Sequence, residues 1–298
     1  MADYLVTHLT RYTYSEKVSH CHNIGYLMPQ SDGRQSCSGT EITVHPHPQI
    51  FNERSDYFAN RFCYFSVEDP HSELEVVSKT RVSTTTVAFT DWTQTPAWEG
   101  VAASLKNPAT ADLIVASEFT QPSPFIPLSA ELGAYARHVF SPGRPILDAC
   151  YALARQIHMD FQYDQKATNI LTPLAEVLKS RKGVCQDFAH LCIAAMRSIG
   201  LAASYVSGYI ETFPPEGKPK LRGSDASHAW FAVFVPGIAP DGRGAWFGFD
   251  PTNGKAISEE FIVTARGRDF GDVSPLKGIL FGGGKHVLKV EVDVTRIG

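Results

Sequence analysis

The hydrophobic positions between residues 184 and 199 have the spacing of an α-helix. They recur every three or four residues and so fall on one helical face. The positions are Val184, Phe188, Leu191, Cys192, Ala195, Met196 and Ile199. Gly183 allows a tight turn into this helix, and Gly200 is typical of a helix end. The pattern therefore places Cys185 in the first turn of a helix.

Two later runs, residues 228–235 and 245–250, are short, apolar and rich in aromatic residues, which predicts buried strands. Only a short loop around residues 236–243 joins them, so we expect the two strands to pair antiparallel. His228 begins the first strand and Asp250 ends the second. The pairing would therefore make His228 and Asp250 neighbours across the ladder.

Further elements complete this unit. Helical spacing is also present from Ile146 to Ile157, and Thr172-Pro173 is a typical start for another helix. Residues 202–211 predict a third strand. Helices packed on an antiparallel sheet make the expected fold class α+β.

Residues 1 to about 90 have a different pattern, because hydrophobic and polar residues alternate in short runs. The runs are residues 4–12, 38–44, 60–67 and 74–87. We interpret residues 1–95 as a small β-sandwich domain and residues 128–298 as the core domain. The Pro- and Ser-rich residues 96–127, with a short helical patch, are interpreted as a linker between them.

Cys185, His228 and Asp250 have the residue types of a thiol nucleophile, its base and the group that orients the base. The first turn of a helix would stabilise a thiolate through unpaired backbone N–H groups and the helix dipole. The N–H of Cys185 could also bind the oxyanion that forms on a substrate carbonyl. We interpret the neighbouring Asp187 as a charge at the helix start and not as a catalyst.

Each of the three residues also has a structural interpretation. A free cysteine is often a small buried hydrophobe. A single histidine beside an apolar run is often a hydrogen-bonded structural residue, and an aspartate before proline often forms a turn. The predicted pairing of His228 with Asp250 favours the catalytic interpretation.

The surrounding sequence resembles the bacterial branch of the transglutaminase-like cysteine hydrolase superfamily. The matching segments, in the right order and spacing, are Phe161-Gln162-Tyr163, residues 181–190, residues 202–209, residues 227–230 and residues 249–253. The resemblance covers about residues 145–255. It implies a papain-related α+β core with Cys185 as nucleophile, His228 as base and Asp250 as the orienting carboxylate.

The resemblance extends to both ends of the chain. Residues 12–23 resemble the small β domain that precedes the core in many bacterial members, and residues 282–294 resemble the closing strand of the family. Tyr163 matches an aromatic position of the family and, with Gln186 and Trp230, is a candidate for the oxyanion site or the cleft wall. Trp230 could equally be a core residue.

These features predict an enzyme that cleaves a peptide or carboxamide C–N bond through a thioester, most simply a cysteine protease or amide hydrolase. If an amine resolves the thioester in place of water, the activity would be that of a transglutaminase. A third hypothesis is a non-catalytic binding module that uses the β-sandwich as its partner surface. The intact set of three residues argues against that hypothesis.

Composition limits the compartment and the partners. A net charge of −4 gives no support for nucleic acid as a partner, and no apolar stretch approaches the roughly 18 residues of a membrane span. The N-terminus has no basic region followed by an apolar run, so we expect no secretory signal. The six cysteines are dispersed, with no C-x-x-C. Together these features predict a cytoplasmic location and a peptide or protein amide as the partner.

Two groups of residues are candidates for metal binding. Four histidines lie in pairs in the N-terminal region: His20, His22, His45 and His47. No carboxylate or cysteine with matching spacing accompanies them. Cys185, His228 and Asp250 would be chemically acceptable zinc ligands, but a helix N-terminus would compete with a cation for the thiolate. There is also no Asp-x-Asp-x-Asp calcium loop. We therefore expect no metal and no cofactor.

Overall fold

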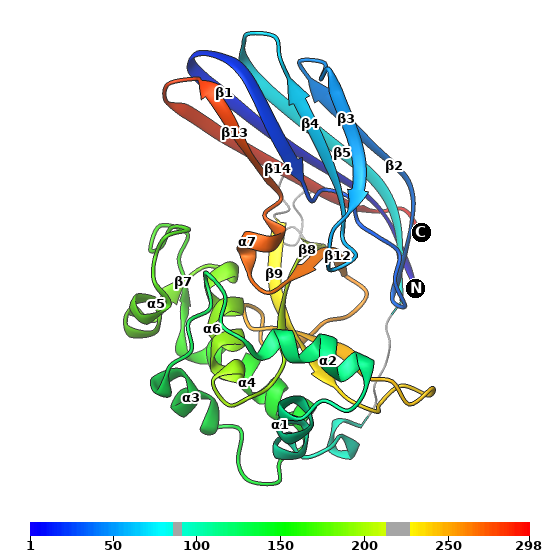
Figure 1. Cartoon of the computed structure of the whole chain (residues 1–298), viewed down its shortest axis with the longest axis vertical. Helices are drawn as coiled ribbons and strands as arrows, with labels where there is room; N and C mark the ends of the chain where they lie inside the picture. The colour runs from blue at the N-terminus through cyan, green and yellow to red at the C-terminus, as the bar shows by residue number, and fades with distance from the viewer. Residues whose placement is uncertain (86–90, 213–226) are drawn as a thin grey trace, which may run out of the picture.

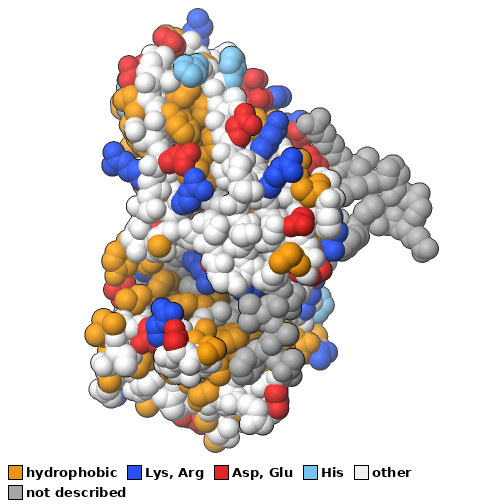
Figure 2. Space-filling view, turned by 90° about the vertical axis from the view of Figure 1, so that its right-hand side faces the viewer, with side chains coloured by type: hydrophobic (Ala, Val, Ile, Leu, Met, Phe, Trp, Pro, Cys, Tyr) orange, Lys and Arg blue, Asp and Glu red, His pale blue; other side chains and the backbone are white. Residues whose placement is uncertain are grey.

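The structure is a computed structural model that describes residues 1–85, 91–212 and 227–298. It has two lobes, an N-terminal sheet and a lobe in which helices pack on a second sheet (Figure 1). This confirms the predicted α+β class. On the face seen in Figure 2, basic and acidic side chains are interspersed over both lobes. Within the described residues, no helix is long and apolar enough to cross a lipid bilayer.

The N-terminal lobe is one antiparallel sheet built around a very long first strand. Its strands are β1 (Ala2–Gly25), β2 (Gln35–His45), β3 (Ile50–Ser55), β4 (Arg61–Val67), β5 (His71–Thr84), β13 (Leu276–Gly282) and β14 (His286–Arg296). The first half of β1 pairs with β5 and β14, and the second half pairs with β4 and β13. β2 and β3 lie outside β5 and β4.

The N-terminal lobe packs like the predicted sandwich because its single sheet folds over on itself. The bend runs across all the strands of the sheet. The register of β1 shifts between Thr13 and Val18, where its neighbours are also interrupted. Phe65 of β4 and Leu74 of β5 belong to one buried cluster, although they lie on opposite sides of the bend. The two halves of the curled sheet therefore pack against each other and share one core.

The C-terminal strands differ from the prediction. The sequence placed residues 128–298 in the core, with the last strand closing it, whereas β13 and β14 hydrogen-bond to β1 of the N-terminal sheet. Tyr4 pairs with Arg296, so the two ends of the chain lie side by side (Figure 1). An alternating run predicts a strand but not its partner, because pairing is decided by contacts far away in the sequence.

Residues 96–127 also differ from the expected linker. They contain α1 (Trp98–Lys106), α2 (Ala111–Ser117) and the short 3₁₀ helix η2 (Glu118–Thr120). Six of their apolar side chains are buried in the hydrophobic cluster of the core domain: Val101, Leu105, Leu113, Ala116, Phe119 and Ile126. The segment is thus packed against the core, because its few apolar residues are spaced for short amphipathic helices.

The core sheet has the strand order β11-β10-β9-β8-β12. The strands are β8 (Ala203–Ile210), β9 (Ser227–Val235), β10 (Ala245–Asp250), β11 (Lys255–Ala256) and β12 (Phe261–Gly267). The predicted antiparallel pairing of β9 with β10 is confirmed, with Phe249 opposite Phe231.

Helices and two short strands surround this sheet. They are η1 (Trp92–Gln94), α3 (Ala130–Arg137), α4 (Ile146–Asp160), β6 (Gln162–Tyr163), α5 (Leu174–Ser180), β7 (Lys182–Gly183), α6 (Cys185–Arg197) and α7 (Phe270–Val273). α6 is buried from Asp187 to Arg197 and contacts α3, α4, α5, β8 and β9. A helix enclosed on all sides holds its first residue, Cys185, in a fixed place.

The two lobes are joined by apolar packing and by paired amide groups. Tyr4 and Val294 of the N-terminal sheet pack with Ile262 of β12. The side-chain amide of Gln35 exchanges two hydrogen bonds, both 2.8 Å, with the backbone of Val263 on β12. Asn60 makes the same pair of bonds, both 2.7 Å, with the backbone of Arg266. These amides satisfy backbone groups on the edge of the core sheet.

Candidate active site

Cys185 is the first residue of α6, as the sequence predicts, and it is half-buried. The carboxylate of Asp187 accepts the backbone N–H of Val184 at 2.9 Å and the hydroxyl of Thr168 at 2.6 Å. A Cβ atom on Gly183 would lie 2.8 Å from this carboxylate, so only glycine fits there without displacement. Asp187 therefore fixes the helix start, which agrees with the interpretation of its charge.

His228 and Asp250 are neighbours, which confirms the predicted pairing. The Nε2 atom of His228, at the start of β9, lies 2.9 Å from Oδ2 of Asp250, at the end of β10. The imidazole is nearly buried, and the carboxylate is fully buried. Because Nε2 faces Asp250, Nδ1 is the ring nitrogen left to interact with the thiol of Cys185.

The carboxylate of Asp250 is surrounded by donors from the turn that follows it. Its Oδ1 accepts the backbone N–H groups of Thr252 at 2.8 Å and Asn253 at 3.3 Å. Its Oδ2 accepts the side-chain amide of Asn253 at 2.6 Å, in addition to His228. A fully buried carboxylate needs such donors to remain ionised.

These contacts determine the pKa values of His228 and Asp250. Burial alone would lower the pKa of His228, but its hydrogen bonds with Asp250 and with Cys185 raise that pKa to about 10. Burial would raise the pKa of Asp250, but the hydrogen bonds from His228, Asn253 and the backbone of Thr252 lower it. At neutral pH the pair is therefore an imidazolium held by a carboxylate, which suits a thiolate partner.

Tyr163 lies beside the nucleophile, where the sequence suggested it. Its backbone pairs with Gly183 in the two-stranded β6–β7 ladder, two residues before Cys185. Burial raises the pKa of its hydroxyl, a hydrogen bond with Gln165 lowers it, and electrostatic interaction with Cys185 raises it. The side chain is 48% exposed, so it is accessible to a molecule at Cys185. Its use as a donor or a cleft wall stays a prediction.

Gln186 and Trp230 have different surroundings. Gln186 is the second residue of α6 and is half-buried. Trp230 has no exposed surface and packs with Phe261 beside the imidazole of His228, at ring centroid distances of 5.3 and 6.1 Å. Its burial is that of a core residue and not of a cleft wall. Its indole N–H has no hydrogen-bond partner among the described residues.

Three further residues interact with side chains at or beside this site and were not predicted from the sequence. Asn253 binds Asp250, and Thr168 binds Asp187. Tyr205 is buried, which raises the pKa of its hydroxyl, and electrostatic interaction with Cys185 raises it further. Asn253 stands in the segment that carries the resemblance, but its side-chain contact is visible only in the folded turn.

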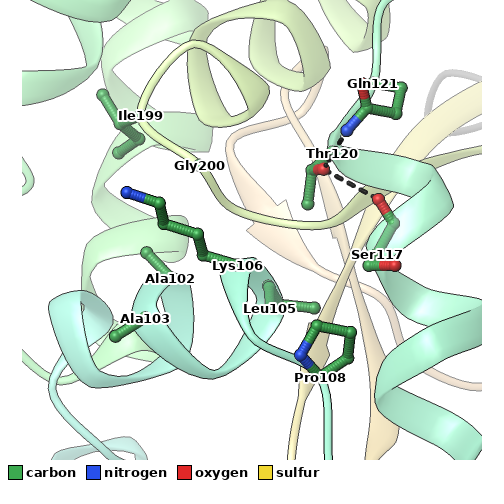
Figure 3. A pocket seen from close by; sticks show the side chains of 10 residues that line it. All are labelled: Ala102, Ala103, Leu105, Lys106, Pro108, Ser117, Thr120, Gln121, Ile199 and Gly200. Atoms are coloured by element: carbon green, nitrogen blue, oxygen red, sulfur yellow. Dashed lines mark hydrogen bonds between the residues drawn. The ribbon is translucent and has the colours of Figure 1, made fainter.

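A cavity of about 530 Å³ lies elsewhere in the core domain, between α1, the Ser117–Gln121 segment and the turn at Ile199-Gly200 (Figure 3). Its lining includes no cysteine, histidine or carboxylate. It adjoins the C-terminal end of α6, whereas Cys185 is at the N-terminal end, roughly 20 Å away along a helix of this length. It is therefore separate from the group around Cys185.

Two of the four histidines considered for metal binding have other contacts. His20 stacks on Phe281 at 4.2 Å, and Nδ1 of His22 lies 2.9 Å from the hydroxyl of Tyr64. Across residues 1–85, 91–212 and 227–298 no three histidine, cysteine or acidic side chains are grouped as a metal site. The six cysteines are all free thiols.

In this structure a cysteine at the start of an enclosed helix faces a histidine and an aspartate on two paired strands. This arrangement defines the class of papain-related α+β proteins. Comparison with known proteins identifies the family within that class. Residues 133–251 match the family model of the transglutaminase-like superfamily, and residues 4–83 match the bacterial transglutaminase-like N-terminal region. The chain belongs to this superfamily and has both regions of its bacterial branch.

Relatives cover almost the whole chain. The uncharacterized protein Rv2569c of Mycobacterium tuberculosis is 39% identical over 98% of this chain and 92% of its own length. The uncharacterized protein ML0607 of Mycobacterium leprae is 30% identical, with 98% of each chain covered. Among solved structures, a putative cysteine protease from Cytophaga hutchinsonii superposes with a TM-score of 0.75 at 19% identity, covering 100% of this chain and 91% of that one. This last likeness supports the fold.

Proposed function

We propose that this protein is a cysteine-dependent amide hydrolase that acts on a peptide or related carboxamide. The contact that carries the proposal is the 2.9 Å hydrogen bond between His228 and Asp250, in a site where His228 also interacts with Cys185. A buried imidazole whose pKa is raised to about 10 stays protonated at neutral pH. It can therefore stabilise a thiolate and later donate a proton.

The reaction proceeds in two balanced steps. The thiolate of Cys185 attacks the carbonyl carbon, so a C–S bond forms, and the C–N bond breaks as His228 gives its proton to the leaving amine. Neutral His228 then takes a proton from water, which attacks the thioester and releases a carboxylic acid and the thiolate. The unpaired N–H groups in the first turn of α6 stabilise the oxyanion in both steps.

The proposal is tested by the rate at which iodoacetamide alkylates each cysteine between pH 4 and 9, measured by peptide mapping. We expect fast alkylation of Cys185 at pH 5–6, lost in His228→Ala. Cys37 is an internal reference, because burial raises its pKa to about 11 and keeps it slow throughout this range. Slow alkylation of Cys185, with the same pH dependence as an ordinary thiol, would overturn the proposal.

The second measurement is turnover of a peptide library by the wild type and by Cys185→Ala, with and without an added primary amine. Hydrolysis products that require Cys185 and form equally well with the amine present support the proposal. Products that carry the amine would instead show acyl transfer. If Cys185 is reactive but no amide in the library is cleaved or modified, the proposed activity is contradicted.

A further inference from the structure

We propose that Asn253 is a positioning residue of the reaction, a fourth member of the group formed by Cys185, His228 and Asp250. This inference rests on the proposed function. The side-chain amide of Asn253 donates to Oδ2 of Asp250 at 2.6 Å, and this is the same oxygen that binds His228 at 2.9 Å. Asn253 therefore acts on the imidazole through the carboxylate.

Hydrogen bonds to both oxygens fix the orientation of the Asp250 carboxylate. Its other oxygen, Oδ1, is held by the backbone N–H groups of Thr252 and Asn253. Rotation of the carboxylate would break these two bonds and the amide bond from Asn253 together. The remaining lone-pair direction on Oδ2 points at Nε2 of His228, so the ring nitrogen that faces Cys185 is fixed as Nδ1.

The turn that carries Asn253 is itself anchored from the neighbouring helix. Nδ1–H of His158, on α4, donates to the carbonyl oxygen of Thr252 at 2.7 Å. Gly254 has a φ of +63°, and a Cβ there would lie 3.1 Å from the ring of His158. β11 then pairs Lys255 with Asp250. The amide of Asn253 is thus presented by a turn that is fixed on both sides.

The role of Asn253 is distinct from filling space. Asp250 is fully buried and ionised, and the amide is one of the donors that lowers its pKa. Without this donor, protonation of the carboxylate should occur at a higher pH, and the imidazolium would lose its partner there. A residue that only filled space would change stability without moving the acid side of the reactivity profile.

Two substitutions separate these roles. Asn253→Ala removes the amide, whereas Asn253→Asp keeps the shape and places a second carboxylate against Asp250. We expect alkylation of Cys185 by iodoacetamide at pH 6 to slow about tenfold in the first variant and about a hundredfold in the second. In Asn253→Ala the acid side of the pH profile should move to higher pH. Asn52→Asp, on the exposed strand β3, is the matched control and should behave as wild type.

The outcomes are distinct from those that test the proposed function. If Cys185 is reactive in the wild type and Asn253→Asp is no slower than Asn253→Ala, or neither profile moves, the inference is overturned while the proposed function stands. If Cys185 is unreactive in the wild type, the proposed function itself fails. Thermal unfolding shows whether each variant folds. Should Asn253→Asp not fold, the profile of Asn253→Ala decides alone.

Discussion

His228 and His190 lie in the same domain, both are buried and both are near an aspartate. Their pKa values are nevertheless shifted in opposite directions. The pKa of His228 is raised to about 10, because hydrogen bonds with Asp250 and Cys185 outweigh the effect of burial. Burial lowers the pKa of His190 to about 4, and the negative charge of Asp269 offsets this only in part.

The difference comes from how each ring nitrogen and each carboxylate is used. Nε2 of His190 accepts the backbone N–H of Phe270 at 3.2 Å, which requires that this nitrogen carry no proton. The carboxylate of Asp269 accepts two backbone N–H groups, those of Phe125 and Gly271. His228 instead faces a carboxylate oxygen directly. The pKa of a buried histidine thus depends on its partners and not on burial alone.

The largest effect expected is on the reactivity of Cys185. His228→Gln should slow its alkylation at pH 6 by roughly a thousandfold or more, because the thiolate loses its imidazolium. His190→Gln, the matched variant five residues along α6 from Cys185, should change that rate less than about threefold. Peptide mapping after timed exposure to iodoacetamide measures both. Equal losses in the two variants would mean that the histidines support the fold alone.

Substitutions of Asp250 and Asp269 should likewise differ in their effects. Asp250→Asn should reduce turnover by about 10²- to 10⁴-fold, because the imidazole loses its orientation and its counter-charge. Asp269→Asn should leave turnover nearly unchanged and lower stability, since among the described residues its carboxylate accepts hydrogen bonds from backbone groups, those of Phe125 and Gly271. Turnover and chemical denaturation are measured on both. Unchanged rates in Asp250→Asn would remove Asp250 from the reaction.

The sequence was sufficient to predict the pairing of His228 with Asp250 but not the proximity of His190 to Asp269. His228 and Asp250 stand at the ends of two adjacent strands, and local periodicity locates strand ends. His190 and Asp269 come from α6 and from the residue before α7, so nothing local relates them. The same limit explains why the pairing of β14 with β1 was missed, and why the side-chain bond from Asn253 was not anticipated. Strand and helix periods are local, but sheet partners and side-chain contacts are not.

The pH dependence of stability should also differ between the two histidines. The folded pKa of His228 lies above 6.5, so its contribution is complete below that pH and is lost as pH rises through about 10. The folded pKa of His190 lies below 6.5, so its contribution is complete above that pH and is lost as pH falls toward about 4. Each slope should be roughly 1 kcal/mol per pH unit within its window.

Denaturant unfolding from pH 4 to 10 measures these slopes as the difference between wild type and variant. His228→Gln should flatten the alkaline side only, and His190→Gln the acid side only. His8 is also buried with a pKa lowered to about 4, but it is present in all three proteins and its contribution cancels. A wild type whose stability increased from pH 7 to 10 relative to His228→Gln would contradict the expected sign.

The smallest effect tests whether a third buried carboxylate, Asp187, resembles Asp269 or Asp250. Its bonds go to the backbone of Val184 and to Thr168, which makes it structural like Asp269. Gly183→Ala would press on this carboxylate and should cost about 1–3 kcal/mol of unfolding free energy. Gly100→Ala, in α1 with open space around it, should instead add about 0.5–1 kcal/mol. Because Asp187 fixes the residue before Cys185, alkylation in Gly183→Ala should slow only a few-fold, with its pH profile unmoved. A shifted profile would place Asp187 with the ionising group around His228.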